Sequence, residues 1–373
     1  MNSEYRDGPI NYAEMEPEYD MEFARYGPNP IELPLSPPGT PPPDVEDTTF
    51  RRELSPFSET SSMTSVNSTE SVGYYREEGG RMFPNVPDAP VVLPVDSAEM
   101  RRLSIQYNLI KLVVGDRHHG EINELLNPPY EASIRVLDVI SNTPWIDEMA
   151  KEYPHVKFTG CNLVPTRHPH TPNIQLEVYN LHQGFHGRNE SYDLIHMSGT
   201  FKFSRDFKFW LREMKRLLKP NGILIVTDLE MALWMRDGSD PRARIPSVWE
   251  YTTQMAQGLY SQGIDLRNMS MVGTWLREMG GFSEIEDTVT CIPIGEWEED
   301  ELQREIGIMA RDNVMLALIS THPLWHRAGK TQEEIDRFMS AARTELYEPN
   351  AELFERMFYT FARKEEALYE GNL

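Results

Sequence analysis

The chain has little cysteine. Among its 373 residues only Cys161 and Cys291 occur, so it has neither the cysteine framework of a small secreted domain nor the paired spacing of a structural zinc site. Both cysteines lie in apolar, strand-like stretches, where a free cysteine is usually a small buried side chain. We therefore expect no disulfide and no metal centre.

Basic residues and long apolar runs are also scarce. There are 36 Lys and Arg against 59 Asp and Glu, which gives a formal net charge of −23. Direct nucleic-acid binding needs clustered cations for the phosphates, so we expect none. No run of 18 or more apolar residues occurs, and the first residues lack a signal-peptide pattern. We therefore expect no membrane partner and an intracellular location, cytoplasmic or nuclear.

The first part of the chain differs in composition from the rest. Residues 1–80 contain 16 Asp and Glu against 5 Arg, and 10 of the 28 prolines fall in the first 50 residues. Such a segment buries too little apolar surface to offset its ordering entropy. We expect a disordered acidic Pro/Ser-rich tail over residues 1–85 and a folded domain over residues 86–373. The tail is either a spacer or a segment that binds a protein partner through its aromatic residues, Tyr5, Tyr12, Tyr19, Phe23 and Tyr26.

From about residue 98 the pattern becomes globular. A leading helix fits Ala98–Val114, and strands then alternate with helices, which predicts a doubly wound α/β sheet. The strands of this sheet are expected at Ser133–Val139, Val156–Asn162, Ile174–Tyr179, Tyr192–Met197 and Gly222–Asp228, with helices at Trp145–Tyr153 and Asp206–Leu218. Further helices are expected at Val248–Gln262, Val272–Met279, Glu301–Ser320 and Gln332–Leu346, and a closing strand pair at Phe282–Ile292 and Phe358–Arg363. The ligand cleft of such a sheet lies at the carboxyl ends of its parallel strands.

Glycine is missing from the turn where it is most expected. The first strand of the sheet carries Asp138 near its end, and the turn that follows reads Ile140-Ser141-Asn142-Thr143-Pro144. In nucleotide-type sites this turn is glycine-rich, because glycine permits the tight bend and lets the backbone approach the ligand. Pro144 can still begin the next helix, which is a normal position for proline.

The order of the motifs resembles the fungal class I S-adenosylmethionine (SAM)-dependent methyltransferases, especially the group that includes the velvet-associated regulator of secondary metabolism. The resemblance covers roughly residues 98–366 and is carried by Val136-Leu137-Asp138-Val139, Thr159-Gly160-Cys161-Asn162-Leu163, Glu177-Val178-Tyr179-Asn180, Ser191-Tyr192-Asp193-Leu194-Ile195-His196, Leu217-Leu218-Lys219-Pro220-Asn221-Gly222 and Glu278-Met279-Gly280-Gly281-Phe282. It implies a class I methyltransferase-like sheet with a leading helix and helical cap insertions, and it implies SAM as the cofactor.

The residues that hold SAM in the family transfer poorly to this chain. The family's Gly-x-Gly-x-Gly pattern falls on Ile140, Asn142 and Pro144, and the acidic residue that binds the ribose hydroxyls falls on Asn162. An Asn offers one acceptor oxygen and no charge, and losing a charge-assisted hydrogen bond costs about 1.5–3 kcal/mol. The acidic residue beside the adenine is replaced at Tyr179-Asn180.

The leading helix departs from the family as well, with Ser104 and Tyr107 where Asp and His are common. The positions that the resemblance assigns to the cofactor are thus Asp138, Ile140, Asn142, Pro144, Asn162, Leu163, Tyr179, Asn180 and Met197. Methyl transfer by in-line displacement needs no universal base, so we assign no catalytic residue.

Two hypotheses follow. In the first, which we favour, the domain has lost or weakened SAM binding and has a binding or regulatory role. In the second, it is an active methyltransferase on a small-molecule or protein acceptor. His118-His119, His168 and His170 are read as surface or internally satisfied residues rather than as metal ligands. The residues Trp249, Tyr251, Met255 and Tyr260 form either core or an acceptor pocket.

Overall fold

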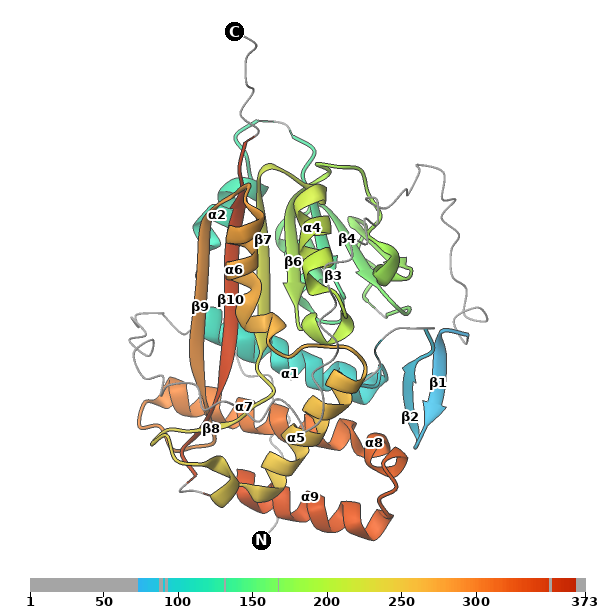
Figure 1. The fold of residues 1–373 in the computed structure, drawn as a ribbon. Helices are drawn as coiled ribbons and strands as arrows, with labels where there is room; N and C mark the ends of the chain where they lie inside the picture. Colours follow the sequence, from blue (N-terminus) through green and yellow to red (C-terminus); the bar gives the residue numbers. More distant parts are fainter. Residues whose placement is uncertain are drawn as a thin grey trace.

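The computed structural model describes residues 73–86, 90, 93–130, 132–166, 168–348 and 351–366 (Figure 1). The first 72 residues lie outside the described part, so the disorder expected for them stays a prediction. The strands are β1 (Tyr75–Glu78), β2 (Arg81–Pro84), β3 (Arg135–Val139), β4 (Lys157–Asn162), β5 (Ile174–Val178), β6 (Tyr192–Ser198), β7 (Leu218–Leu229), β8 (Trp234–Met235), β9 (Phe282–Ile294) and β10 (Leu353–Lys364).

A central sheet organises the molecule. Its strands follow the order β5-β4-β3-β6-β7-β10-β8, and β9 pairs with β10. The pairs among β3, β4, β5, β6 and β7 are parallel, whereas β10 runs antiparallel to β7, β8 and β9. The strand order reverses between β3 and β6, and the ligand cleft of a doubly wound sheet lies at such a point. The doubly wound class I methyltransferase-like sheet expected from the sequence is confirmed.

The helices are α1 (Ser97–Val114), α2 (His119–Leu126), α3 (Trp145–Glu152), α4 (Phe207–Leu217), α5 (Pro246–Ser261), α6 (Asn268–Met279), α7 (Glu301–Ser320), α8 (His322–Arg327) and α9 (Gln332–Leu346). In Figure 1, α4 and α6 lie in front of the sheet, while α5, α7, α8 and α9 gather below it as a helical cap. The cap therefore lies at the end of the sheet where β7 finishes and the chain enters α5. This arrangement matches the leading helix and cap insertions expected from the resemblance.

The two faces of β10 show why the sheet is covered on both sides. Phe358 and Thr360 line a small gap together with residues of α4 and α6. Tyr359 and Phe361 point to the other face, where the His118 ring stacks on both of them, with centroids 5.8 and 3.9 Å away. A strand that is apolar on both faces has to be buried between two layers. His118 is thus packed inside the protein, whereas the sequence left open a surface or an internally satisfied position.

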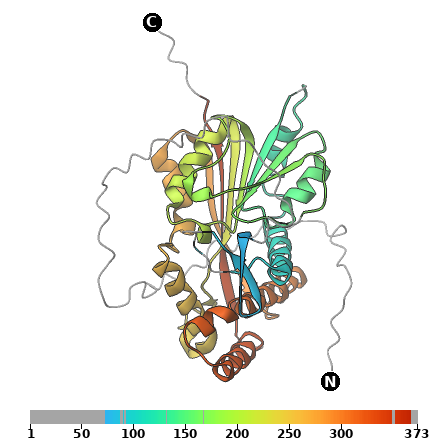
Figure 2. The ribbon, with the colours of Figure 1, turned by 90° about the vertical axis from the view of Figure 1, so that its right-hand side faces the viewer.

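The segment before α1 corrects one expectation. Residues 75–84, which we assigned to a disordered tail, form the antiparallel hairpin β1–β2. Figure 2 shows this hairpin in front of the junction between the sheet and the cap. Phe83 is completely buried, and Arg81 donates to Asp96 at the start of α1. The hairpin was not predicted from the sequence, because its strands are short and charged and follow a Ser/Thr-rich stretch.

The core is continuous from the leading helix to β10 and is mainly aliphatic and aromatic. Cys161 is fully buried, as expected, and burial raises the pKa of its thiol to about 12. Cys291 is only half-buried. Among the described residues, no helix is long and apolar enough to cross a membrane.

Candidate functional site

The turn after β3 keeps a sharp bend without glycine. Ile140 has φ +56°, a left-handed conformation, and its side chain is buried. For a β-branched residue this conformation costs on the order of 1–2 kcal/mol. Pro144 adopts helical angles, and its carbonyl accepts the first hydrogen bond of α3 from the Glu148 N–H at 3.0 Å. The turn is therefore strained at its first residue and well formed at its last.

Asn162, at the end of β4, forms side-chain hydrogen bonds with this turn and with the residue that follows it. Its side-chain amide donates to the Oδ1 atom of Asn142, and its own Oδ1 accepts from the Leu163 N–H at 2.8 Å. The Asn162 residue is 5% exposed. Both hydrogen-bonding groups of this side chain are thus used within the protein, and Asn142 supplies one of the partners.

His168, in the loop after β4, contacts the same turn. One ring nitrogen lies 2.9 Å from Asp147 Oδ2 on α3, and the other lies 3.0 Å from the Ser141 carbonyl oxygen. The ring therefore ties the loop after β4 to both the turn and α3. From the sequence we expected His168 to be a surface or internally satisfied residue rather than a metal ligand, and both of its ring nitrogens have partners within the protein. Its proline-rich loop carries no signal that would have indicated this contact.

A buried polar pair lies on the sheet below the turn. Asp138 Oδ1 is 2.8 Å from His196 Nδ1, and the two residues are directly paired across β3 and β6. The His196 ring stacks on Trp145, with centroids 3.9 Å apart and planes 13° apart. His196 and Trp145 were seen in the sequence only as parts of family motifs. Within the described part of the chain, Asp138 Oδ2 is buried and has no hydrogen-bond partner.

The end of β5 is also satisfied internally. Asn180 Oδ1 accepts from the His182 N–H at 3.1 Å, which caps a short helical turn over Leu181–Gln183. The Tyr179 ring stacks on His186 with centroids 3.7 Å apart, and burial raises the pKa of its phenol well above its usual value. The oxygen that we expected beside an adenine therefore has a backbone partner.

Ser104 and Tyr107 of α1, which stand where the family commonly has Asp and His, both form hydrogen bonds within the protein. Ser104 donates to the Met100 carbonyl within its own helix at 3.0 Å. Tyr107 donates to Glu148 on α3 at 2.6 Å. Burial is the main cause that raises the pKa of this phenol, and the hydrogen bond to Glu148 raises it further. Tyr107 thereby ties the leading helix to the helix that follows the turn.

The structure brings most of the assigned cofactor positions into one region. Asp138, Ile140 and Asn142 lie along β3 and its turn, Asn162 and Leu163 end β4, and the Tyr179 N–H bonds the Asn162 carbonyl at 3.1 Å. Leu163 and Met197 are buried apolar side chains of the core. In the described part of the chain, no cluster of three or more His, Cys, Asp or Glu could hold a metal ion.

These features define a class I methyltransferase fold. Residues 156–226 match the family model described as a methyltransferase domain. The chain is 24% identical over 356 residues to the secondary metabolism regulator laeA of Coprinopsis cinerea, covering 93% of this chain and 86% of that protein. It is 26% identical over 297 residues to the secondary metabolism regulator LAE1 of Pyricularia oryzae, covering 76% and 86%.

A third relative is named as an enzyme. The N-methyltransferase sirN of Leptosphaeria maculans is 24% identical over 273 residues, covering 70% of this chain and 88% of that protein. The chain thus contains a match to a methyltransferase domain and is similar over most of its length to fungal secondary metabolism regulators and to a fungal N-methyltransferase.

Proposed function

We propose that this chain is a methyltransferase-fold protein of the fungal secondary-metabolism regulatory type, in which SAM binding is weakened or lost and the role is binding or regulation. The observation that carries this proposal is that the Asn162 side chain is uncharged and already hydrogen-bonded within the protein. The residue at this position should offer a charged acceptor to two ribose hydroxyls. Asn162 is neutral, and its one side-chain oxygen already accepts from the Leu163 N–H.

The neighbouring contacts support the same conclusion. Asn142 is bonded to the Asn162 amide, and Asn180 to the His182 backbone. A ligand that displaced these contacts would have to replace each hydrogen bond, and each buried group left unpaired costs about 1–3 kcal/mol. The residues around the expected ribose and adenine positions therefore do not fit SAM as they stand.

A specific observation favours the alternative, an active SAM-dependent methyltransferase acting on a small-molecule or protein acceptor. Three buried polar atoms near the turn have no hydrogen-bond partner in the described part of the chain: Asp138 Oδ2, Ser141 Oγ and Asp147 Oδ1. Buried polar groups are normally paired, so these atoms are available to a ligand. The name of the sirN relative also agrees with an enzyme.

Calorimetric titration of the full chain with SAM, and separately with S-adenosylhomocysteine, distinguishes the two. We expect no binding at millimolar ligand to a sample that unfolds cooperatively. Binding in the low micromolar range would contradict the proposal and would justify a screen for methyl acceptors.

A restoring variant tests the physical reason. Asn162→Asp combined with Ile140→Gly, Asn142→Gly and Pro144→Gly returns the ribose acceptor and removes the Asn142 side chain. We expect this variant to gain SAM affinity by at least about tenfold, the value of one charge-assisted hydrogen bond. Asn127→Asp, an exposed position after α2, is the matched control and should gain nothing. No gain in the restoring variant would show that the cleft is filled by other side chains.

The acidic tail is the proposed contact for a protein partner. Its net negative charge favours a basic partner such as a histone, and screening by salt should weaken the interaction. Fluorescence anisotropy with labelled core histones should show salt-sensitive binding that is lost when residues 1–72 are removed. The same assay with duplex DNA should show no binding.

A further inference from the structure

A cavity of about 100 Å3 lies where the end of β7 meets the helical cap. Its walls come from segments far apart in the sequence: α1, the short turn at 201–203, the end of β7, α5, α7 and β10. None of the nine positions assigned to SAM lines it. The cavity is therefore a feature separate from the turn after β3.

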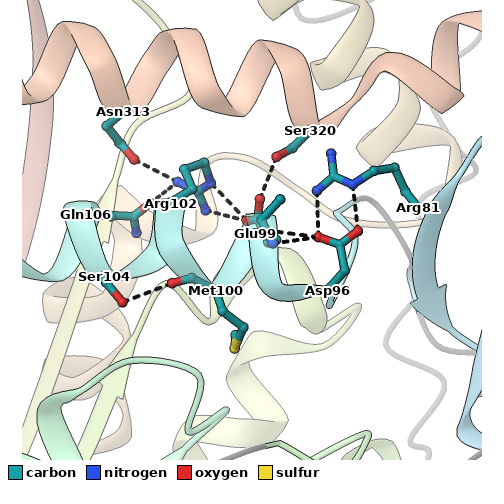
Figure 3. A network of polar contacts seen from close by, with 10 residues as sticks. Arg81, Asp96, Glu99, Met100, Arg102, Ser104, Gln106, Asn313 and Ser320 are labelled. Atoms are coloured by element: carbon teal, nitrogen blue, oxygen red, sulfur yellow. Dashed lines mark hydrogen bonds and ion pairs between the residues drawn. The ribbon is translucent and has the colours of Figure 1, made fainter. Parts of the chain in front are cut away.

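One ion pair in the cavity wall, Arg102 with Glu99, has hydrogen-bond partners for both of its charged groups. Figure 3 shows Arg102 and Glu99 on α1 facing α7. The Arg102 guanidinium donates to Glu99 Oε1 at 2.7 and 2.9 Å and to Asn313 at 2.8 Å, and Glu99 Oε2 accepts from Ser320 at 2.7 Å. Glu99 and Arg102 are 1% and 3% exposed. Because this pair is neutral and richly hydrogen-bonded, it needs no further ion.

A second pair of opposite charges faces the same space. Asp228, at the end of β7, accepts from the backbone N–H groups of Thr200 and Phe201 at 3.0 and 3.3 Å. The Lys202 ammonium and Asp228 Oδ1 lie 3.4 and 4.0 Å from the position that a Cβ atom on Gly199 would occupy. Burial raises the pKa of Asp228, and the positive charge of Lys202 acts against that rise. Two backbone N–H groups and the charge of Lys202 thus act on Asp228.

Glu230, which also lines the cavity, is paired with Arg356 at 2.5 and 2.6 Å. Glu355 on β10 has no such partner. It is 3% exposed, it lines the cavity, and its Oε1 atom has no hydrogen-bond partner in the described part of the chain. A buried carboxyl oxygen that lacks a hydrogen-bond donor is costly, and a bound cation that donates a hydrogen bond to it would remove the cost.

We propose that this cavity binds a small aliphatic amine, with the ammonium group held by Glu355 and the hydrocarbon part against Leu233, Tyr251 and Met255. An ammonium supplies the hydrogen-bond donor that Glu355 Oε1 lacks. A carboxylate ligand has no hydrogen to donate to Glu355 Oε1, and a neutral apolar ligand would leave this oxygen unpaired. The proposal goes beyond the proposed function and does not depend on whether SAM binds.

The test uses the full chain and three probes of equal length: n-butylamine, 1-butanol and butyrate. Saturation-transfer NMR and calorimetry, at about pH 8.5 where the amine is protonated, measure the affinity of each. We expect n-butylamine to bind at least about tenfold more tightly than the other two, as one charge-assisted hydrogen bond implies.

Two variants locate the site. Glu355→Gln keeps the side-chain volume and removes the charge, and should weaken n-butylamine at least about tenfold. Ala317→Leu keeps every charge but fills the cavity, and should weaken it by a similar factor. Glu352→Gln, whose side chain is 51% exposed, is the matched control and should leave binding unchanged.

Equal affinity for n-butylamine and 1-butanol would overturn the proposal. So would full n-butylamine binding by a folded Glu355→Gln variant, or unchanged binding after Ala317→Leu, since either result would place the amine elsewhere. If Glu352→Gln weakened n-butylamine binding as much as Glu355→Gln does, the effect would come from the overall charge of the protein. That result would also overturn the proposal. A SAM titration of the same samples reports separately on the proposed function.

Discussion

At the scale of single residues, two substitutions carry the functional argument. Asn162 stands where the resemblance places a charged acceptor, and its side chain is bonded to Asn142 and to the Leu163 backbone. Ile140 keeps a left-handed backbone with a buried β-branched side chain. The Asn162 side chain is therefore hydrogen-bonded within the protein, and the turn at Ile140 keeps its bend at a cost in strain.

The unpaired Glu355 gives a prediction at the same scale. Burial, reinforced by the nearby negative charge of Glu230 and opposed by Arg102, raises the pKa of its carboxyl to about 8 from a usual 4.5. Between these values the unfolded chain releases a proton that the folded chain keeps, so Glu355 lowers the free energy of unfolding as pH rises.

Glu355→Gln should remove this contribution. Relative to the parent protein, its free energy of unfolding should rise by about 2–5 kcal/mol between pH 4 and 9, an order-of-magnitude figure from the pKa difference. Urea unfolding across that range measures it. A constant offset between the two proteins would instead mean that the carboxyl ionises at its ordinary pH.

At the scale of elements, the start of α1 joins three structural features. Asp96 caps the helix by accepting from the N–H groups of Ala98 and Glu99 at 3.2 and 3.1 Å. It also accepts from Arg81 of the hairpin at 2.6 and 2.9 Å. Burial alone would raise the pKa of Asp96, but the hydrogen bonds from Arg81 and the backbone outweigh it and lower the pKa.

Asp96→Ala should therefore lower the free energy of unfolding by about 2 kcal/mol at neutral pH, which combines the loss of a helix cap with the loss of the Arg81 contact. The matched variant Asp300→Ala removes a similar cap from α7, where Asp300 accepts from the Gln303 N–H, and should cost about 1 kcal/mol. Because the folded pKa of Asp96 is lowered, its contribution should be lost as pH falls below the usual Asp value of 3.8. Equal losses in the two variants would show that the hairpin contact contributes nothing.

At the scale of the whole molecule, the hairpin decides where the folded domain begins. Besides its link to α1, it is joined to α8 by Glu78 and Arg327, and the Val95 N–H donates to the Met82 carbonyl at 2.7 Å. These contacts connect the hairpin to both the leading helix and the cap. The domain therefore starts earlier than the composition of the chain suggested.

Two truncations test this boundary. A fragment of residues 86–373 should be less stable than one of residues 73–373 by about 2–4 kcal/mol, because it loses the fully buried Phe83 and the hairpin contacts. Chemical unfolding of both fragments gives the comparison. Identical stability would restore the boundary at residue 85.

The sequence by itself determined most of the element plan. Short apolar runs that alternate with helical segments located the parallel strands, and helical spacing located α7 and α9 with the observed bounds. These signals are local, because a strand or helix of a buried core repeats its apolar side chains at a fixed period. The turn at 140–144 was also recognisable, since the absence of glycine is visible in the letters alone.

The tertiary structure alone decided which side chains meet. The Asn162 and Asn142 contact and the ring of His168 on the turn depend on how the loop after β4 folds back. The cavity is lined by Arg102 on α1 and Glu355 on β10, which are far apart in the sequence and meet only in the folded chain. Whether a polar group is paired or left alone depends on neighbours that are remote in the chain, and no periodic pattern records them. For that reason the fold followed from the sequence, while the state of the site did not.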